Sequence, residues 1–381
     1  MPQSPSNKRL RAQLAASFPL AAVLLALAAC TATAGTYGST PVNISPGRGG
    51  TPANGASGEP AVSGDNRSVR YVAYSSLASN LVSGDTNGVS DIFVWRRPRG
   101  GFPHSVGQGK LLRISVGPGR RQANGASANP SVDGSMVNRP HCVAFQSTAT
   151  NLSPKDALPD SDIYVRDLRR GRTVLVSNGI TADATDVSIA GNCKKAVFEA
   201  GGKVYWSRVG AGKPRSLGNG TQPAYARDGK SIVFRRSGGR IVFRHGGFKA
   251  VLSNGTRPRV SDYSTGHGWA VVYNSGGNVK LGLINRGHKS VQTAVRRAIV
   301  GGVTSRAAHR GIVVWARRSA LFYLNRHTGN SDDLAYARQP ITEIASSARA
   351  NLIAFAAQGG YSFIDTKNNA QPSVYAKWLP K

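Results

Sequence analysis

The chain has 381 residues, with 49 Lys and Arg against 18 Asp and Glu, and its formal net charge is +31 at neutral pH. A chain of this length usually holds two domains, but repeat folds often run longer as a single unit. No stretch shows a sustained 3.6-residue apolar period, which excludes helical repeats.

The N-terminus has the pattern of a secretory signal. Lys8, Arg9 and Arg11 precede the apolar run Phe18–Ala29, which is too short to span a bilayer comfortably. We therefore expect an exported protein, membrane-anchored or free in the periplasm or outside the cell, with a signal peptide at residues 1–29.

Two processing sites overlap at the end of this segment. Leu27–Cys30 resembles a bacterial lipobox, in which Cys30 becomes the lipidated first residue and residues 30–40 form a tether to the membrane. The alternative is cleavage by ordinary signal peptidase at Ala32–Ala34, which discards Cys30 with the signal.

The rest of the chain is predicted to be all-β. Its apolar residues form short runs with period-2 character, bounded by Gly, Asn, Asp or Ser. Examples are "YVAYS", "DIFVW", "CVAFQ", "DIYVRD", "KAVFEA", "SIVFRR", "WAVVYN", "GIVVWA" and "LIAFAA".

These strands belong to a repeated unit. The segment "ANGASGEPAVSGDNRSVRYVAYSSLASNLVSGDTNGVSDIFVW" matches "ANGASANPSVDGSMVNRPHCVAFQSTATNLSPKDALPDSDIYVR" in wording and order, and shorter copies begin at Leu217 and Leu252. Fainter copies begin near Thr185, Val303 and Ile341. Units of about four short strands are typical of propeller blades, which stack radially because one blade cannot bury both of its faces.

We therefore expect a single β-propeller of four-stranded blades over residues 41–381, with seven blades favoured and six possible. The x-P-x-x-S start, the "YVAYSS" and "CVAFQS" strands, the Asn-Leu loop and "SDIFV" or "SDIYVRD" resemble the WD-repeat-like propeller family typified by the periplasmic protein TolB. The resemblance covers most of residues 40–365 and is degenerate from Asn178 onward.

The N-terminal strand is predicted to close the ring. "VNIS" stands before the first "ANGAS" at the same distance as "LRIS" before the second, as expected for the outer strand of a blade. "ITEIASS", "LIAFAA" and "YSFID" would supply the other three strands of that blade. Alternatively, "SVYAKW" fills the outer place.

Cys142 and Cys193 enter the second strands of successive units, and in an oxidising compartment they are candidates for a disulfide. A bridge requires Cα atoms within about 7 Å. The two cysteines are offset by two residues relative to Phe145 and Phe198, so the alternative is two buried free thiols.

Asp85, Asn87 and Asp91 have a spacing that could provide three oxygen ligands to calcium. The second unit has Asp156, Asp160 and Asp162 in the equivalent loop, and later units have no such cluster. We favour a structural turn that positions the strand Ile92–Trp95, with Asp85 and Asp91 accepting backbone N–H bonds, and keep calcium as the alternative.

Positive charge is concentrated in the second half. Only Asp228 and Asp262 are acidic between Gly201 and Ser331, whereas Arg pairs are frequent there. The predicted basic surface comprises Arg235, Arg236, Arg296, Arg297, Arg317 and Arg318. Its partners would be an envelope protein or a polyanionic glycan or wall polymer; no nucleic acid is expected, because no binding motif is present. The alternative is a solvated basic surface without a selected partner.

No catalytic motif is recognisable, and the seven histidines are scattered singly. We therefore expect a non-catalytic binding or scaffold propeller that recognises a protein or an anionic envelope polymer on the face formed by the loops leading into each blade and those between its second and third strands. The alternative is a propeller hydrolase or lyase acting on a sugar-type substrate.

Overall fold

A computed structural model of the chain describes residues 41–65, 69–98, 108–135, 137–156, 158–263, 267–285, 288–303, 311–326, 331–347, 350–358 and 371–378. The predicted signal peptide, the tether and Cys30 lie outside these residues. No helix among the described residues is long and apolar enough to cross a membrane.

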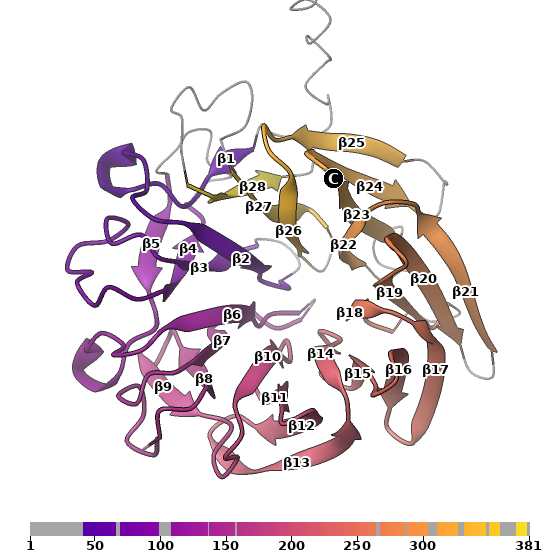
Figure 1. Ribbon diagram of the computed structural model, residues 1–381, viewed down its shortest axis with the longest axis horizontal. Helices are drawn as coiled ribbons and strands as arrows, with labels where there is room; N and C mark the ends of the chain where they lie inside the picture. The colour runs from indigo at the N-terminus through magenta and orange to yellow at the C-terminus, as the bar shows by residue number, and fades with distance from the viewer. Residues whose placement is uncertain are drawn as a thin grey trace, which may run out of the picture. The chain divides into compact units, whose positions relative to one another are not determined.

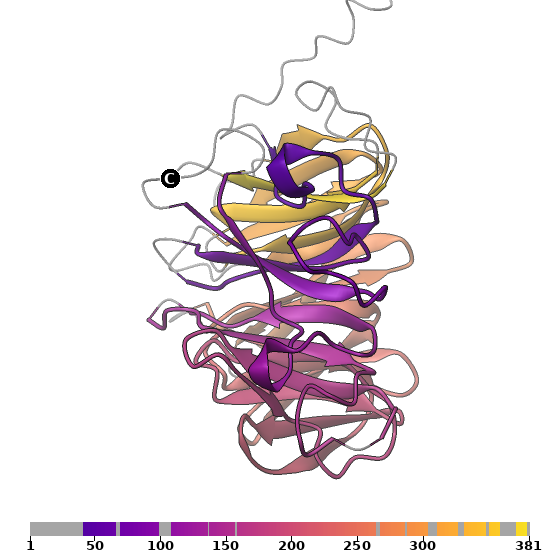
Figure 2. The same cartoon turned by 90° about the vertical axis from the view of Figure 1, so that its left-hand side faces the viewer.

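The described strands form seven antiparallel sheets of four strands, arranged as a ring of seven blades (Figure 1). This confirms the propeller and selects seven blades over six. Turned on its edge, the ring is thinner than it is wide (Figure 2).

The first three blades follow one another along the chain. Blade 1 consists of β2 (Ser57–Val62), β3 (Tyr71–Ser76), β4 (Asp91–Arg96) and β5 (Lys110–Arg113). Blade 2 consists of β6 (Ser127–Val132), β7 (Cys142–Ser147), β8 (Asp162–Asp167) and β9 (Arg172–Leu175). Blade 3 consists of β10 (Ala184–Ile189), β11 (Lys195–Ala200), β12 (Lys203–Arg208) and β13 (Ala211–Asn219). Short 3₁₀ helices η1 (Arg48–Gly50) and η2 (Pro118–Arg120) precede blades 1 and 2.

The next three blades come from the basic half of the chain. Blade 4 consists of β14 (Thr221–Tyr225), β15 (Ser231–Arg235), β16 (Arg240–His245) and β17 (Phe248–Asn254). Blade 5 consists of β18 (Thr256–Val260), β19 (Trp269–Ser275), β20 (Asn278–Asn285) and β21 (His288–Val295). Blade 6 consists of β22 (Ile299–Val303), β23 (Ile312–Arg317), β24 (Ala320–Asn325) and β25 (Ser331–Tyr336).

Blade 7 joins the two ends of the chain. It consists of β26 (Ile341–Ser346), β27 (Leu352–Ala357), β28 (Ser373–Trp378) and, outermost, β1 (Val42–Asn43). Val42 pairs with Ala376, and the Ile44 N–H donates to the Val374 carbonyl at 3.0 Å. The N-terminal strand therefore closes the ring, as predicted.

The predicted third strand of this blade is wrong. β28 pairs directly with β27, whereas "YSFID", residues 361–365, lies outside the described residues. The alternative place for "SVYAKW", outermost in the blade, is also wrong, because β1 pairs with its free edge. Val374, Tyr375 and Ala376 are fully buried, as befits a strand with neighbours on both sides.

The core lies between neighbouring blades. The second and third strands of four blades place an aromatic pair at directly opposed positions: Tyr74 and Phe93, Phe145 and Tyr164, Phe198 and Tyr205, Phe355 and Tyr375. Each pair stacks and packs on small or branched residues of the blade before it, as Tyr74 does on Ala354 and Val374. These strands are buried on both faces, which explains their nearly continuous apolar sequences.

Candidate functional site

The innermost strand of every blade contains a β-bulge at the same step. In five blades the bulge holds a non-glycine residue at positive φ: Glu59 (54°), Asn129 (48°), Asp186 (50°), Gln222 (54°) and Arg257 (51°). Four of these residues precede proline, which has no N–H to donate to the ladder and so favours an interruption there. The bulges thus set a polar side chain at one mouth of the central channel, blade after blade.

These side chains connect neighbouring blades around the channel. The Glu343 carboxylate of blade 7 accepts the Glu59 N–H of blade 1, and the Glu59 carboxylate accepts the Asn129 N–H of blade 2 at 2.7 Å. In the same sense, the Gln222 side-chain oxygen accepts the Arg257 N–H of the next blade at 2.8 Å. In all five blades with a non-glycine bulge residue at positive φ, the N–H of that residue is satisfied by a side chain of the preceding blade.

The channel has a volume of about 530 Å³ and is lined by the innermost strands of all seven blades. The charges on its lining strands are divided between sides. Glu59, Glu343 and Asp186 come from blades 1, 7 and 3, whereas Arg257 and Arg259 come from blade 5. Burial raises the pKa of Glu343 and of Asp186, and burial lowers the pKa of Arg259, which is surrounded by protein yet open to channel solvent.

At the other end of the channel, Arg227 of blade 4 bridges distant blades. Its guanidinium donates to the Val132 carbonyl of blade 2 at 2.6 Å and to the Val62 carbonyl of blade 1 at 2.8 Å. Desolvation lowers the pKa of Arg227, and the opposing effect of the nearby carboxylates, first that of Asp262, keeps its charge favourable. Arg227 therefore ties three blades together at this end.

A basic groove adjoins the mouth lined by the bulges. It has a volume of about 380 Å³, shares Arg257 and Ile299 with the channel lining, and runs between blades 5 and 6. Arg297 lies in the turn leading into β22, while Arg317 and Arg318 lie at the turn between β23 and β24. No acidic residue is among the described residues that line the groove.

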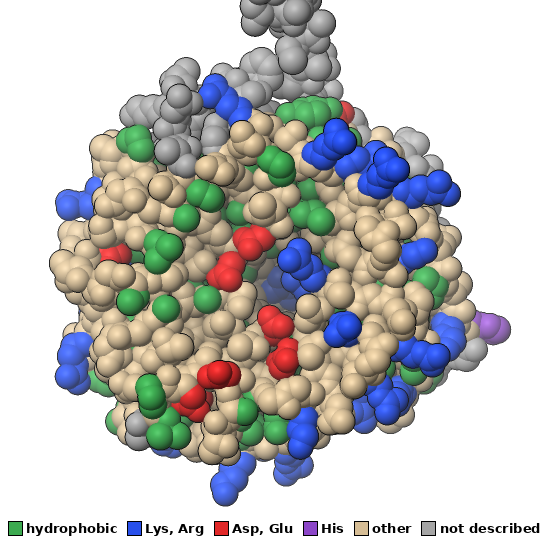
Figure 3. Space-filling model, viewed as in Figure 1, with side chains coloured by type: hydrophobic (Ala, Val, Ile, Leu, Met, Phe, Trp, Pro, Cys, Tyr) green, Lys and Arg blue, Asp and Glu red, His purple; other side chains and the backbone are tan. Residues whose placement is uncertain are grey.

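Only some of the predicted basic surface forms this groove. Arg297, Arg317 and Arg318 line it, and the Arg317 guanidinium donates to the Arg296 carbonyl at 2.7 Å. Arg235 and Arg236 lie at the β15–β16 turn of blade 4, outside the groove lining. Figure 3 shows acidic side chains and some Lys and Arg around the central hollow of one face, with further Lys and Arg around its periphery, mostly over β14–β25.

The repeated "ANG" and Asn-Leu segments build the loops of the same face. In blade 1 the Ser79 N–H donates to the Asn54 side chain at 2.9 Å, and the Asn54 N–H donates to the Asn80 side chain at 3.1 Å. Asn124 and Asn151 repeat the arrangement in blade 2. The two asparagines tie the loop leading into the blade to the loop between its second and third strands.

The loop predicted as a turn or a calcium site is occupied by a guanidinium. Arg113 Nη1 lies 2.8 Å from Asp85 Oδ1 and 3.3 Å from Asp91 Oδ2, and the Asn87 amide donates to Asp91 Oδ2 at 3.0 Å. Burial raises the pKa of both carboxyl groups, and Arg113 opposes that rise. Gly88 has a φ of 70°, as a tight turn requires. Gly88 thus fits a turn, but among the described residues Asp85 and Asp91 accept side-chain donors, from Arg113, Asn87 and Ser115, in place of the expected backbone N–H groups.

Blade 2 lacks the equivalent arginine. Phe93 pairs with Arg113 in blade 1, and Tyr164 pairs with Leu175 in blade 2, so Leu175 occupies the place of Arg113. Asp156, Asp160 and Asp162 gather there with oxygens within 4.8 Å of one another. Burial raises the pKa of Asp162 to about 6, and the neighbouring carboxylates act in the same direction.

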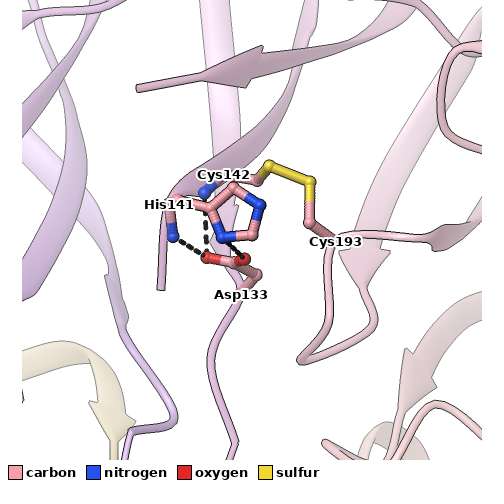
Figure 4. A group of neighbouring side chains, drawn as sticks. All are labelled: Asp133, His141, Cys142 and Cys193. Carbon is pink, nitrogen blue, oxygen red and sulfur yellow. Dashed lines mark hydrogen bonds and ion pairs between the residues drawn. A yellow bond between two sulfur atoms is a disulfide. The ribbon is translucent and has the colours of Figure 1, made fainter. Parts of the chain in front are cut away.

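Cys142 and Cys193 are joined in a disulfide between blades 2 and 3, with their Cα atoms 5.9 Å apart. Cys193 lies before β11, in a turn with a φ of 61°, which takes up the two-residue offset seen in the sequence. Asp133 and His141 adjoin the bridge (Figure 4).

Neither protein-family models nor curated proteins gave a match to this chain. The bulge ring, the bridging Arg227 and the counter-ion Arg113 are absent from the sequence-based expectations. The repeated polar residue before proline was the available signal for the ring. No histidine is among the described residues lining the channel.

Proposed function

We propose that this protein is an exported, non-catalytic binding propeller of the TolB-like kind, which recognises an anionic polymer of the bacterial envelope. The observation that carries the proposal is the basic groove between blades 5 and 6, where four arginines converge beside the channel mouth. Guanidinium groups suit phosphate and carboxylate because their donors form a planar fork.

The position of the groove agrees with this use. Arg297 and Arg318 are exposed, and both lie in turns on the face where the blades begin. Backbone conformations with φ of 51° and 52° hold these two arginines at the tips of their turns. The carboxylates lie deeper, around the channel, so a polyanion would follow the arginine groove and avoid the mouth.

The test is binding of fluorescent poly(glycerol phosphate), with neutral dextran as the control polymer. We expect affinity to fall steeply with salt, because binding releases counterions. The variant Arg297→Gln/Arg318→Gln should lose about tenfold in affinity and reduce the salt slope by about 2.

The matched control is Arg169→Gln/Arg170→Gln, which removes the same charge from the exposed β8–β9 turn. Equal losses of affinity in both variants would show that binding depends only on the net charge of the protein. Binding that ignores salt would instead support a protein partner recognised by shape.

Export and anchoring rest on the N-terminal sequence. In the lipoprotein route the mature chain begins at diacylated Cys30, and intact-mass measurement of membrane-extracted protein tests this. A mature N-terminus at Gly35 without lipid mass would contradict it.

The propeller enzyme is a second candidate, and one observation favours it. Glu343 and Glu59 both line the channel, and the Glu343 carboxylate accepts the Glu59 N–H; burial raises the pKa of Glu343, and this hydrogen bond opposes the rise. Two carboxyl groups, one as acid and one as base or nucleophile, carry out glycoside hydrolysis. The test is release of reducing sugar from envelope glycans by the wild-type protein. If sugar is released, and Glu343→Gln abolishes the release, the protein is an enzyme.

A further inference from the structure

Four side chains at the junction of blades 2 and 3 form a set of metal-ligand type. Asp133 follows β6, His141 precedes β7, Cys142 begins β7, and Cys193 precedes β11. One potential ligand atom from each lies within 4.8 Å of all the others. In Figure 4 the imidazole lies between the Asp133 carboxylate and the disulfide.

We propose that the chain with this disulfide reduced binds one Zn²⁺ through Asp133, His141, Cys142 and Cys193. Two thiolates, one imidazole and one carboxylate are the ligand types that zinc prefers in tetrahedral sites. The disulfide and the zinc complex are then alternative ways of joining the same two blades.

The distances favour this site. Zinc bonds of about 2.0–2.3 Å place tetrahedral ligand atoms about 3.3–3.8 Å apart. His141 Nδ1 lies 3.3 Å from Asp133 Oδ2, a suitable separation for two ligands, and 3.2 Å from the Arg139 carbonyl oxygen, a contact that zinc at Nδ1 would replace. The Cα atoms of the cysteines are 5.9 Å apart, and side-chain rotation can separate the sulfurs once their bond is broken.

The surroundings hold the aspartate in place. Asp133 Oδ1 accepts the N–H groups of His141 and Cys142 at 2.8 and 2.9 Å, whereas Oδ2 is buried and faces the His141 ring nitrogen at 3.3 Å. Asp133 and Cys142 are fully buried, while the His141 side chain is 23% exposed and Cys193 is partly exposed. The exposed pair gives a reductant and a metal ion a path to the site.

The chemistry balances with a trialkylphosphine as reductant. The phosphine attacks one sulfur and the S–S bond breaks; water supplies the oxygen of the phosphine oxide and two protons, which leave both cysteines as thiols. Zinc then displaces those two protons to the buffer, and a neutral His141 donates a ring-nitrogen lone pair.

The experiment uses the full chain, oxidised or phosphine-reduced, in oxygen-free buffer. We expect one zinc per reduced chain after desalting, none per oxidised chain, and a rise of several degrees in the melting temperature of the reduced chain. Co²⁺ in place of zinc should give thiolate-to-metal charge-transfer bands and the strong visible bands of a tetrahedral site.

Four variants test the ligands. Cys193→Ser, His141→Ala and Asp133→Asn should each weaken binding at least tenfold, and Asp133→Asn can retain the two backbone hydrogen bonds. His288→Ala, an exposed histidine on β21, is the matched control and should bind normally.

Two results would overturn the proposal. One is a reduced chain that keeps its circular dichroism spectrum and takes up no stoichiometric metal. The other is uptake that persists unchanged in His141→Ala and Cys193→Ser, because adventitious metal would do the same.

Discussion

Arg113 supplies the first blade with a positive charge between two carboxylates that burial would otherwise destabilise. Its side chain is 10% exposed, and it also donates to the Gly84 carbonyl and the Gln122 side chain. The guanidinium thereby joins the loop before β4 to the end of β5. In blade 2, Leu175 provides no such charge, and burial, with the neighbouring carboxylates, raises the pKa of Asp162 to about 6.

Replacing Arg113 with Leu should lower the free energy of unfolding by about 3 kcal/mol, because it leaves Asp85 and Asp91 unpaired. The measurement is urea denaturation, with Asp91→Asn and the double variant completing a cycle. Additive losses in that cycle would show that the pair does not interact.

The same loop is the candidate calcium site, and we expect it not to bind calcium. With Arg113 in place, the melting temperature of the wild-type chain should be equal in calcium and in chelator. A rise of several degrees with calcium that is lost in Asp85→Ala would restore the metal interpretation.

At the scale of elements, the disulfide joins a strand of blade 2 to a turn of blade 3 across 51 residues. Closing a loop of this length restricts the unfolded chain, so Cys142→Ala/Cys193→Ala should lower the free energy of unfolding by about 4 kcal/mol. Alkylation before and after reduction, followed by mass measurement, counts the thiols. Two thiols alkylated without reduction would contradict the bridge.

β28 carries Lys377, which is only 2% exposed. Burial lowers its pKa to about 8, and Asp333 opposes the shift. Between pH 8 and about 10.5 the unfolded chain therefore binds more protons at this position, and stability from this group rises with pH.

The Lys377→Met variant should remove that rise. We expect the free energy of unfolding of the wild type to approach that of the variant between pH 8 and 10, by at most about 3 kcal/mol. Urea midpoints across this range provide the comparison. If the unfolding free energies of the wild type and the variant changed in parallel with pH, the Lys377 amine would be solvated in the folded protein, and the prediction would be wrong.

The sequence predicted those elements that depend on local residue patterns, and it failed where residues far apart in the chain decide the structure. Strands such as Tyr71–Ser76 were predictable because burial on both faces requires apolar residues throughout. Residues 361–365 and Ser373–Trp378 have similar apolar patterns, and only pairing with β27 distinguishes them. The counter-ion Arg113 lies 22 residues beyond Asp91, so no local spacing reveals it.

The candidate site was predictable only in part. Loops leading into the blades were identified from the "ANG" repeats, and the arginine pairs from composition. Arg257, Arg297, Arg317 and Arg318 come together in one groove because the curvature of the ring places blade 5 beside blade 6. Sequence alone does not specify that curvature.

At the scale of the whole molecule, the ring depends on the short strand β1. Val42 and Ile44 are buried, and the Tyr74 hydroxyl of blade 1 donates to the Ile44 carbonyl at 3.0 Å. A chain beginning at Pro41 should melt like the longer protein. One beginning at Gly47 should lose about 4 kcal/mol of unfolding free energy, mostly from the two apolar side chains. Equal melting temperatures would show that β1 is dispensable.

The closure of blade 7 also sets an order of events during synthesis. The Val374 N–H donates to the Ser45 hydroxyl across 329 residues of chain, the last strand meeting the first. At about 5–20 residues per second, β1 waits roughly 15 to 65 seconds for its partner to be made. Blades 1 to 6 can form their own four-stranded sheets meanwhile, whereas β1 stays an unpaired edge until β28 has been made. Until then the nascent chain presents this short strand to other proteins, and the completed ring withdraws it.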